Sequence, residues 1–133
     1  MKSKKAFSLQ LEQRVLWVRA DGVWNTRTAN DYVQEFRQMV QPIVSAPWAV
    51  VLDFRHWQLS PADVFSILKD NTRWCFEHNL CHVETIFADN AVVMWQFAKA
   101  TEVTNRPVNL ISQVAKDEDA ARTVLRTAGF LNN

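Results

Sequence analysis

The run from Trp48 to Phe54 constrains the fold of this chain more than any other stretch. It reads WAVVLDF and is apolar apart from Asp53. A strand with one wet face alternates apolar and polar residues, whereas a nearly continuous apolar run is typical of a strand covered on both faces. VETIFA, residues 83–88, has the same character. The sequence therefore predicts a sheet with its central strands sandwiched between helices.

Three further segments have the pattern of strands. FSLQL, residues 7–11, alternates apolar and polar residues and predicts an edge strand with one wet face. RVLWVRA, residues 14–20, carries apolar side chains on both faces, so we expect at least partial cover on each. VNLIS, residues 108–112, is predicted as the last strand. The first two strands should form an antiparallel hairpin.

Caps and helical periodicity predict four helices. Thr28 and Asp31 have the form of a capping box before the first helix, and Pro42 should end or kink that helix because proline lacks a donor and clashes with the preceding turn. Asn79 is suited to the left-handed position after the second helix. The predicted ranges are about 28–42, 61–78, 91–103 and 117–129.

The last helix has the best-defined ends. Asp117, Glu118 and Asp119 would lie near the positive end of the helix dipole. Gly129 is suited to the left-handed conformation after the helix, and Phe130 would then pack on Leu125.

Strands that alternate with helices predict right-handed crossovers and a largely parallel sheet. The expected fold class is α/β with the order β-β-α-β-α-β-α-β-α, a mostly parallel five-stranded sheet, an antiparallel amino-terminal edge hairpin and helices packed on it. A chain of 133 residues suits one domain, 1–133, with 1–5 expected to be a disordered tail. Ligands and partners of such sheets bind outside the carboxyl ends of the strands, which selects the loops after Ala20, Asp53 and Ala88.

Composition argues against several classes of function. The 15 Lys and Arg against 14 Asp and Glu leave a formal charge of +1, and the basic run of Lys2, Lys4 and Lys5 is confined to the terminus, so we expect no nucleic-acid partner. With Gly22 and Gly129 as its only glycines, the chain lacks the usual phosphate-binding, dinucleotide-binding and nucleophile-elbow motifs. It also lacks a stretch long and apolar enough for a membrane span or signal peptide. We therefore expect a cytoplasmic protein with no integral membrane segment.

Cys75, His78, Cys81 and His82 offer zinc-ligand chemistry within a short stretch. The chain is expected to turn at Asn79 between the two pairs, and the spacing matches no standard zinc finger. We therefore predict no metal site, and the two cysteines are expected to be thiols.

Asp53, Arg55 and His56 follow the central strand at its carboxyl end, where enzymes of this architecture often place catalytic groups. No nucleophile or oxyanion site accompanies them. The alternative is an Asp53–Arg55 ion pair or hydrogen bonds that hold the loop. We favour the alternative and predict a protein that is not an enzyme and needs no cofactor.

Six tryptophans are many for this length, and most are expected to be core or half-core side chains. Trp24, Trp57 and Trp95, together with Asp53, are candidates to line a crevice for a lipid or another small apolar ligand. The rings would alternatively close the top of the core or form a partner or homodimer surface. An exposed apolar patch would favour a partner, and an enclosed cavity of roughly 300 Å³ or more would favour a ligand.

The order of elements and the stretch LDFRHWQLSPADV resemble the SpoIIAA-like division of the STAS domains, the anti-sigma-factor antagonists, and the related bacterial STAS/SEC14-like proteins. The resemblance extends from Phe7 to Phe130 and includes SAPWAVVLDFRHW and DAARTVLRTAGF. It implies a non-enzymatic bacterial domain that binds another protein, such as a kinase or an anti-sigma-type regulator, and that is sometimes regulated by a serine kinase. The SEC14-like side implies carriage of a lipid or other apolar molecule.

This chain departs from the antagonists at their phosphorylation site. Where they have an Asp-Ser-Ser-Gly-type stretch at the start of the second helix, this chain has PADV, residues 61–64. Ser60 lies a residue or more too early. With Pro61 and Asp63 after it, Ser60 is predicted to be a helix N-cap. We expect the antagonist fold without its switch, while the phosphorylation of Ser60 stays an open question.

The candidate partner-binding or regulatory residues are Arg55, Trp57, Ser60, Asp63 and Phe65. If Trp57 belongs to an interface, truncating it should weaken partner binding more than folding, whereas a stability loss of about 3 to 5 kcal/mol would place it in the core. The predicted edge strand at residues 7–11 leaves a homodimer open as an alternative.

Overall fold

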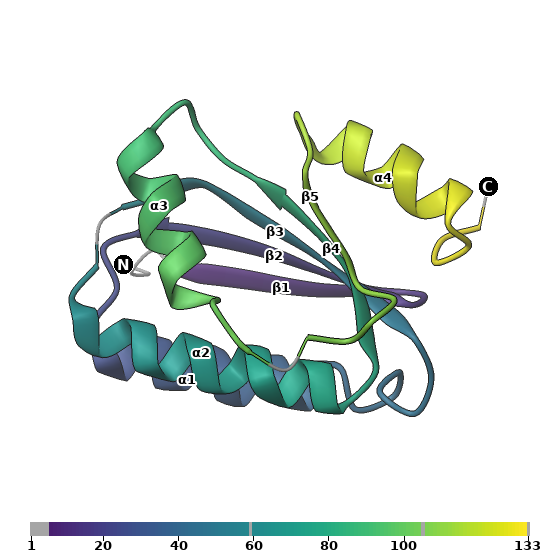
Figure 1. Ribbon diagram of the computed structural model, residues 1–133, viewed down its shortest axis with the longest axis horizontal. Coiled ribbons are helices and arrows are strands. Elements are labelled where there is room, and N and C mark those ends of the chain that lie inside the picture. Colours follow the sequence, from purple (N-terminus) through teal and green to yellow (C-terminus); the bar gives the residue numbers. More distant parts are fainter. Residues whose placement is uncertain (1–5, 59, 105, 133) are drawn as a thin grey trace, which may run out of the picture.

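The computed structural model describes residues 6–58, 60–104 and 106–132, and the predicted tail at residues 1–5 lies outside them. Within these ranges the chain forms strands and helices in the predicted order (Figure 1). They are β1 Phe7–Glu12, β2 Val15–Gly22, α1 Thr26–Met39, β3 Trp48–Trp57, α2 Ala62–Glu77, β4 Leu80–Ile86, α3 Ala91–Ala100, β5 Ile111–Val114 and α4 Glu118–Thr127.

The strands form one sheet in the order β1-β2-β3-β4-β5. β1 pairs antiparallel with β2, and the other neighbours are parallel. The α/β fold class and the amino-terminal edge hairpin are therefore confirmed. β3 is the central strand, and every residue from Trp48 to Phe54 is buried, as its continuous apolar sequence requires.

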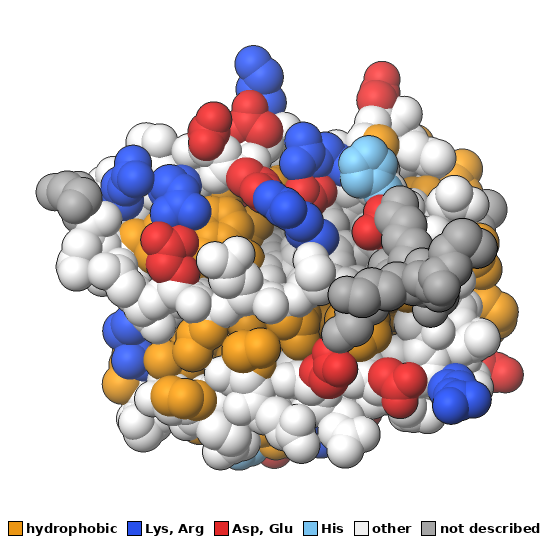
Figure 2. Space-filling model, turned by 180° about the vertical axis from the view of Figure 1, so that it is seen from behind, with side chains coloured by type: hydrophobic (Ala, Val, Ile, Leu, Met, Phe, Trp, Pro, Cys, Tyr) orange, Lys and Arg blue, Asp and Glu red, His pale blue; other side chains and the backbone are white. Residues whose placement is uncertain are grey.

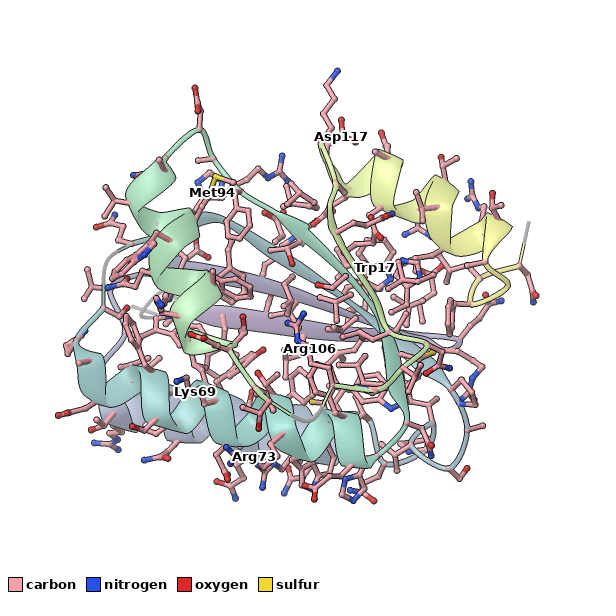
Figure 3. All side chains as sticks on the ribbon, viewed as in Figure 1. Trp17, Lys69, Arg73, Met94, Arg106 and Asp117 are labelled. Atoms are coloured by element: carbon pink, nitrogen blue, oxygen red, sulfur yellow. The ribbon has the colours of Figure 1, made fainter. Side chains whose placement is uncertain are left out.

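Helices cover both faces of the sheet. α1, α2 and α3 pack on one face, where the core cluster includes Phe36, Trp48 and Phe54. α4 lies on the opposite face (Figure 1) and closes a smaller cluster. Trp17 of β2 belongs to this second cluster and is labelled below α4 in Figure 3. The sheet is thus the middle layer of three.

The first helix begins earlier than predicted. The side chain of Asn25 accepts a hydrogen bond from the Thr28 N–H at 2.8 Å, so Asn25 is the N-cap and the predicted capping box of Thr28 and Asp31 is wrong. Asn25 is an equally good capping residue and stands one turn earlier. α1 ends at Met39, before Pro42, as predicted.

Two other boundaries differ from the prediction. α3 ends at Ala100 rather than near Val103, which is buried beyond the helix. β5 begins at Ile111 rather than at Val108, which lies in a turn with its side chain fully exposed. The bounds of β5 are set by its pairing with β4, in which Ile111 lies opposite His82. The local sequence carries no signal of that register.

The predicted helix ends at Asn79 and Gly129 are confirmed. Both residues have positive φ, 74° for Asn79 and 91° for Gly129. Asp117 caps α4 by accepting a hydrogen bond from the Ala120 N–H at 2.8 Å. The Phe130 N–H returns to the Leu125 carbonyl at 2.9 Å, which closes the carboxyl end of α4.

Trp24 and Trp57 close the top of the core. Trp24 is completely buried and Trp57 is 3% exposed. Their ring centroids lie 6.3 Å apart in an edge-on arrangement, and Phe54 packs on Trp57 at 5.2 Å. The assignment of Trp57 to a partner interface is therefore replaced by a core assignment, because its ring offers almost no surface.

Trp57→Ala should lower the free energy of unfolding by about 3 to 5 kcal/mol, because it empties a space the size of an indole in a packed core. Urea denaturation of the dilute protein measures this change. Trp95→Ala is the matched control, because Trp95 is 61% exposed and its truncation should change stability by less than about 0.5 kcal/mol. Equal, small effects of the two substitutions would contradict the core assignment.

Candidate functional site

The carboxyl ends of the central strands open onto a crevice of about 690 Å³, here called the strand-end crevice. The lining comes from the ends of β2 and β3, from the loop between β4 and α3, and from the start of α3. These are the loops predicted to meet at this end of the sheet. The lining residues are Ala6, Asp21, Gly22, Phe54, Arg55, His56, Trp57, Gln58, Ala88, Asn90 and Val93.

Ser60 joins three segments beside this crevice. Its Oγ accepts a hydrogen bond from the Trp24 N–H at 3.1 Å, and its hydroxyl donates to the Gln58 carbonyl at 3.2 Å. The side chain of Gln96 on α3 holds the Ser60 backbone from both sides, accepting from its N–H at 2.9 Å and donating to its carbonyl at 3.0 Å. Ser60 thus ties the loop before α2 to the loop before α1 and to α3.

The prediction that Ser60 caps the second helix is wrong. α2 begins at Ala62, its N-cap is Pro61 with extended backbone, and no side chain caps it. The hydroxyl of Ser60 instead satisfies the N–H of Trp24, a buried residue. A buried backbone donor left without an acceptor costs more than an exposed helix end that water can reach.

Three of the candidate partner-binding residues have accessible side chains. Asp63 is exposed in the first turn of α2, where the helix dipole favours a carboxylate. Phe65 is half-buried and packs against the main core cluster. Arg55 is half-buried and lines the strand-end crevice. Asp63 and Phe65 are here called the α2 entry surface. Arg55 lies at the same end of the sheet but on the face covered by α4, where it pairs with Asp53 near Glu118.

Asp53 and Arg55 form an ion pair at the end of β3. Asp53 is 5% exposed, and Arg55 donates from Nε to Oδ1 at 2.9 Å and from Nη2 to Oδ2 at 2.6 Å. Burial acts to raise the pKa of Asp53, but the hydrogen bonds and charge of Arg55 hold that pKa below its usual value. Arg55 occupies both carboxylate oxygens, so this is the predicted ion pair rather than a base poised for a substrate.

The same side of the sheet carries a second ion pair that reaches α4. Arg19 of β2 places its guanidinium fork on Glu118, with contacts of 2.8 and 2.7 Å. These hydrogen bonds and the charge of Glu118 raise the pKa of Arg19. Bidentate pairs of this kind constrain orientation as well as distance, so the amino end of α4 is held against the ends of β2 and β3.

The four candidate zinc ligands have separate surroundings. Cys75 is buried and burial raises the pKa of its thiol, while Cys81 donates to the Trp48 carbonyl at 3.7 Å. His78 stacks on Trp74 with ring centroids 4.2 Å apart. Over residues 6–58, 60–104 and 106–132, no group of three or more His, Cys, Asp or Glu side chains could hold a metal ion.

The three candidate crevice tryptophans do not line one pocket. Trp57 borders the strand-end crevice, Trp24 lies in the core, and Trp95 points outward from α3. A separate, largely apolar pocket between the sheet and α2, bordered by Tyr32, has a volume of only about 80 Å³. Small-molecule sites are usually at least about 300 Å³.

The surface carries charges of both signs. Figure 2, seen from behind, shows acidic and basic side chains interspersed rather than a broad patch of one sign. In the part of the chain that the structure describes, no helix is both long and apolar enough to span a membrane.

Sequence reasoning missed three side-chain pairings of this region. Gln96 holds Ser60 across 36 positions, and Glu118 holds Arg19 across 99. Neither pairing can be predicted from the local sequence, because the two partners are far apart in the chain. His82 and Glu84 could have been found, because residues two apart on a strand share a face, and their side chains meet at 2.6 Å while fully buried beneath α4.

No family model matches the sequence, and no curated protein sequence is significantly similar to it. Solved structures do match. An uncharacterised protein of the DUF3478 family with a SpoIIAA-like fold, from Shewanella loihica PV-4, gives a TM-score of 0.63 at 12% identity and covers 92% of this chain and 98% of that chain.

Two structures of SpoIIAA also match this chain. The unphosphorylated anti-sigma factor antagonist SpoIIAA gives a TM-score of 0.62 at 10% identity, covering 93% of this chain and 99% of that chain. The phosphorylated form of SpoIIAA, the Bacillus cell fate determinant, gives 0.57 at 14% identity, with 90% and 99% covered. These likenesses confirm the predicted SpoIIAA-like fold.

The Asp53–Arg55 pair predicts a pH dependence. Because the pKa of Asp53 is lower in the folded state, the carboxylate adds stability above its unfolded pKa of about 3.9, and this contribution is lost as the pH falls through the folded pKa. Arg55→Gln should lower the free energy of unfolding by about 1 to 2 kcal/mol at pH 7. The difference from the unmodified chain should shrink below about pH 4 as Asp53 becomes protonated.

Urea denaturation between pH 3 and pH 7 measures this difference. Arg73→Gln is the control, because the pair of Arg73 with Asp70 spans 3.8 Å between exposed side chains, and such pairs contribute little. If Arg55→Gln lowers the free energy of unfolding by the same amount across this pH range, the assignment of an ion pair with Asp53 is contradicted.

Ser60→Ala should lower the free energy of unfolding by about 1 to 3 kcal/mol, because it removes the acceptor of the buried Trp24 N–H. Ser66→Ala, at an exposed position of α2, is the matched control and should be nearly neutral. Amide hydrogen exchange at Trp24 gives a local measurement. Unchanged protection of that amide would contradict the role given to Ser60.

Proposed function

We propose that this chain is a non-enzymatic cytoplasmic domain that regulates another protein by binding it, in the manner of an anti-sigma-factor antagonist. The support is the SpoIIAA-like fold over more than nine-tenths of the chain together with the open surface at the carboxyl ends of the strands. SpoIIAA, which shares this fold, is an anti-sigma factor antagonist. The partner we infer is a protein regulator, a kinase or an anti-sigma-type factor.

The α2 entry surface would carry the contact. It offers the partner the exposed carboxylate of Asp63 and the half-buried ring of Phe65, while Arg55 lines the open crevice at the same end of the sheet. A charged rim around a partly apolar centre is the usual composition of a protein interface. The open crevice at the carboxyl ends of the strands, where α2 begins, is the single observation on which the proposal rests.

The domain would act without a phosphorylated serine. SpoIIAA is known in unphosphorylated and phosphorylated forms, but Ser60 of this chain is 7% exposed and its oxygen is engaged by Trp24. A phosphate there would require the loop to open. Asp63 instead occupies one of the serine positions of the antagonists' stretch, and it would provide a fixed negative charge at the start of α2.

To test the proposal, a photo-activated cross-linking residue is placed at position 63 and the chain is expressed in its own host. We expect an adduct with one other protein, and none from the same residue at position 31, an exposed aspartate of α1. With the purified pair, Asp63→Arg and Phe65→Ala should each weaken binding by about tenfold or more. Asp31→Arg should leave the affinity unchanged.

Other outcomes would overturn the proposal. Stoichiometric phosphate on Ser60 in protein from the host would show that the switch is present. Extra native mass that disappears on denaturation, without a cross-linked partner at position 63, would assign the chain to carriage of a small apolar ligand.

A further inference from the structure

The outward side of α3 is apolar, although a surface helix normally presents polar residues to water. Val93, Phe97 and Ala100 face the core. On the other side, Val92 is 57%, Met94 37% and Trp95 61% exposed. Ala91 and Ala98 are exposed as well. We call Ala91, Val92, Met94, Trp95 and Ala98 the outer α3 surface.

The neighbouring helix shows the ordinary pattern. α2 carries Lys69, Asp70 and Arg73 away from the core, and Figure 3 labels Lys69 and Arg73 along it. Lys99 is the charged residue on the outer side of α3. Its Nζ lies 6.0 Å from the centroid of the Trp95 ring. Among the described residues, Trp95 takes part in no ring pair of the aromatic core.

The outer α3 surface is complementary to itself in shape. Ala91, Trp95 and Ala98 are spaced i, i+4 and i+7, so they lie along one stripe of the helix. The stripe therefore places one large ring between two small side chains. When two such helices run antiparallel, Trp95 of each lies over Ala91 of the other, where a methyl group leaves room for an indole.

The same register brings opposite charges together. Lys99 is four residues after Trp95, and the exposed Asp89 is two residues before Ala91. In the antiparallel pair, the last turn of one α3, which carries Lys99, lies beside the amino end of the other α3, which Asp89 precedes. The two opposite charges therefore lie at the same end of the contact. The competing contact of Lys99 with Glu102 is 3.6 Å long with both side chains half or more exposed, and such pairs are weak.

We propose that the outer α3 surface is a homodimer interface, in which α3 packs antiparallel on α3 of a second copy about a two-fold axis. An isologous contact of this kind needs only one self-complementary patch. One helix on one helix buries less area than a standard interface. A dissociation constant of about 10 to 100 µM is therefore expected.

Sedimentation equilibrium from low micromolar to millimolar protein tests the proposal. We expect the native chain to pass from monomer to dimer across this range. Trp95→Ala should raise the dissociation constant about tenfold or more, because a central aromatic residue dominates a small interface. Val108→Ala is the control, because Val108 is fully exposed but lies outside α3. Circular dichroism confirms that each variant is folded.

A charge exchange tests the register. Asp89→Lys and Lys99→Asp should each weaken the dimer, because each places like charges opposite one another. The double variant Asp89→Lys/Lys99→Asp should restore the dissociation constant to within about threefold of the native value, since opposite charges face each other again. If the two residues act only on the structure of their own chain, the losses of dimer affinity from the two substitutions should add instead.

Several results would overturn the proposal. A chain that stays monomeric at millimolar concentration would overturn it, and Trp95-dependent binding of that monomer to lipid vesicles or to a different protein would assign the surface to that partner instead. A dimer whose dissociation constant is unchanged by Trp95→Ala would place the contact elsewhere, such as on edge strand β1 or β5.

Discussion

The burial of β3 on both faces is the constraint on which the rest of the structure depends. A strand without a wet face needs a helical layer on each side, and α1, α2 and α3 supply one while α4 supplies the other. On the α4 side, Asp53 is the last buried side chain of β3; its carboxylate must be paired, and the half-buried Arg55 two residues later pairs it. The strand-end crevice begins beside this pair.

Beyond that point, Ser60 determines how the surface is built. The loop from β3 to α2 could turn in many ways, but three hydrogen bonds of Ser60 connect it to the loop before α1 and to α3. A fourth joins Ser60 to Gln58 within the loop. Satisfying the buried N–H of Trp24 uses the hydroxyl oxygen that a kinase would need. A serine that holds a binding surface together is poorly suited to switch it, and the exposed carboxylate of Asp63 is the charge that remains at the start of α2.

The sequence predicted what depends on local or periodic patterns. The central strand, the element order, the left-handed ends at Asn79 and Gly129, and the meeting of three loops at one end of the sheet all follow from residues close together in the chain. The errors at Ser60 and at the tryptophans arose where contacts between residues far apart in the chain override the local pattern. Ser60 has a perfect local context for an N-cap, yet its hydroxyl binds a backbone 36 positions away. Likewise, spacing along the chain placed three tryptophans near the crevice, but only side-chain direction separates the buried Trp57 from the exposed Trp95.

α3 connects the two surfaces discussed above. Its inner side carries Gln96, which holds both backbone groups of Ser60 and therefore the loop that leads into α2. Its outer side carries Trp95. The two residues are adjacent, so any partner that fixes the orientation of α3 through Trp95 also fixes the anchor of that loop. Binding at the α2 entry surface and contact at the outer α3 surface would then share one rigid element, and thermodynamic linkage requires that any coupling between them be equal in both directions.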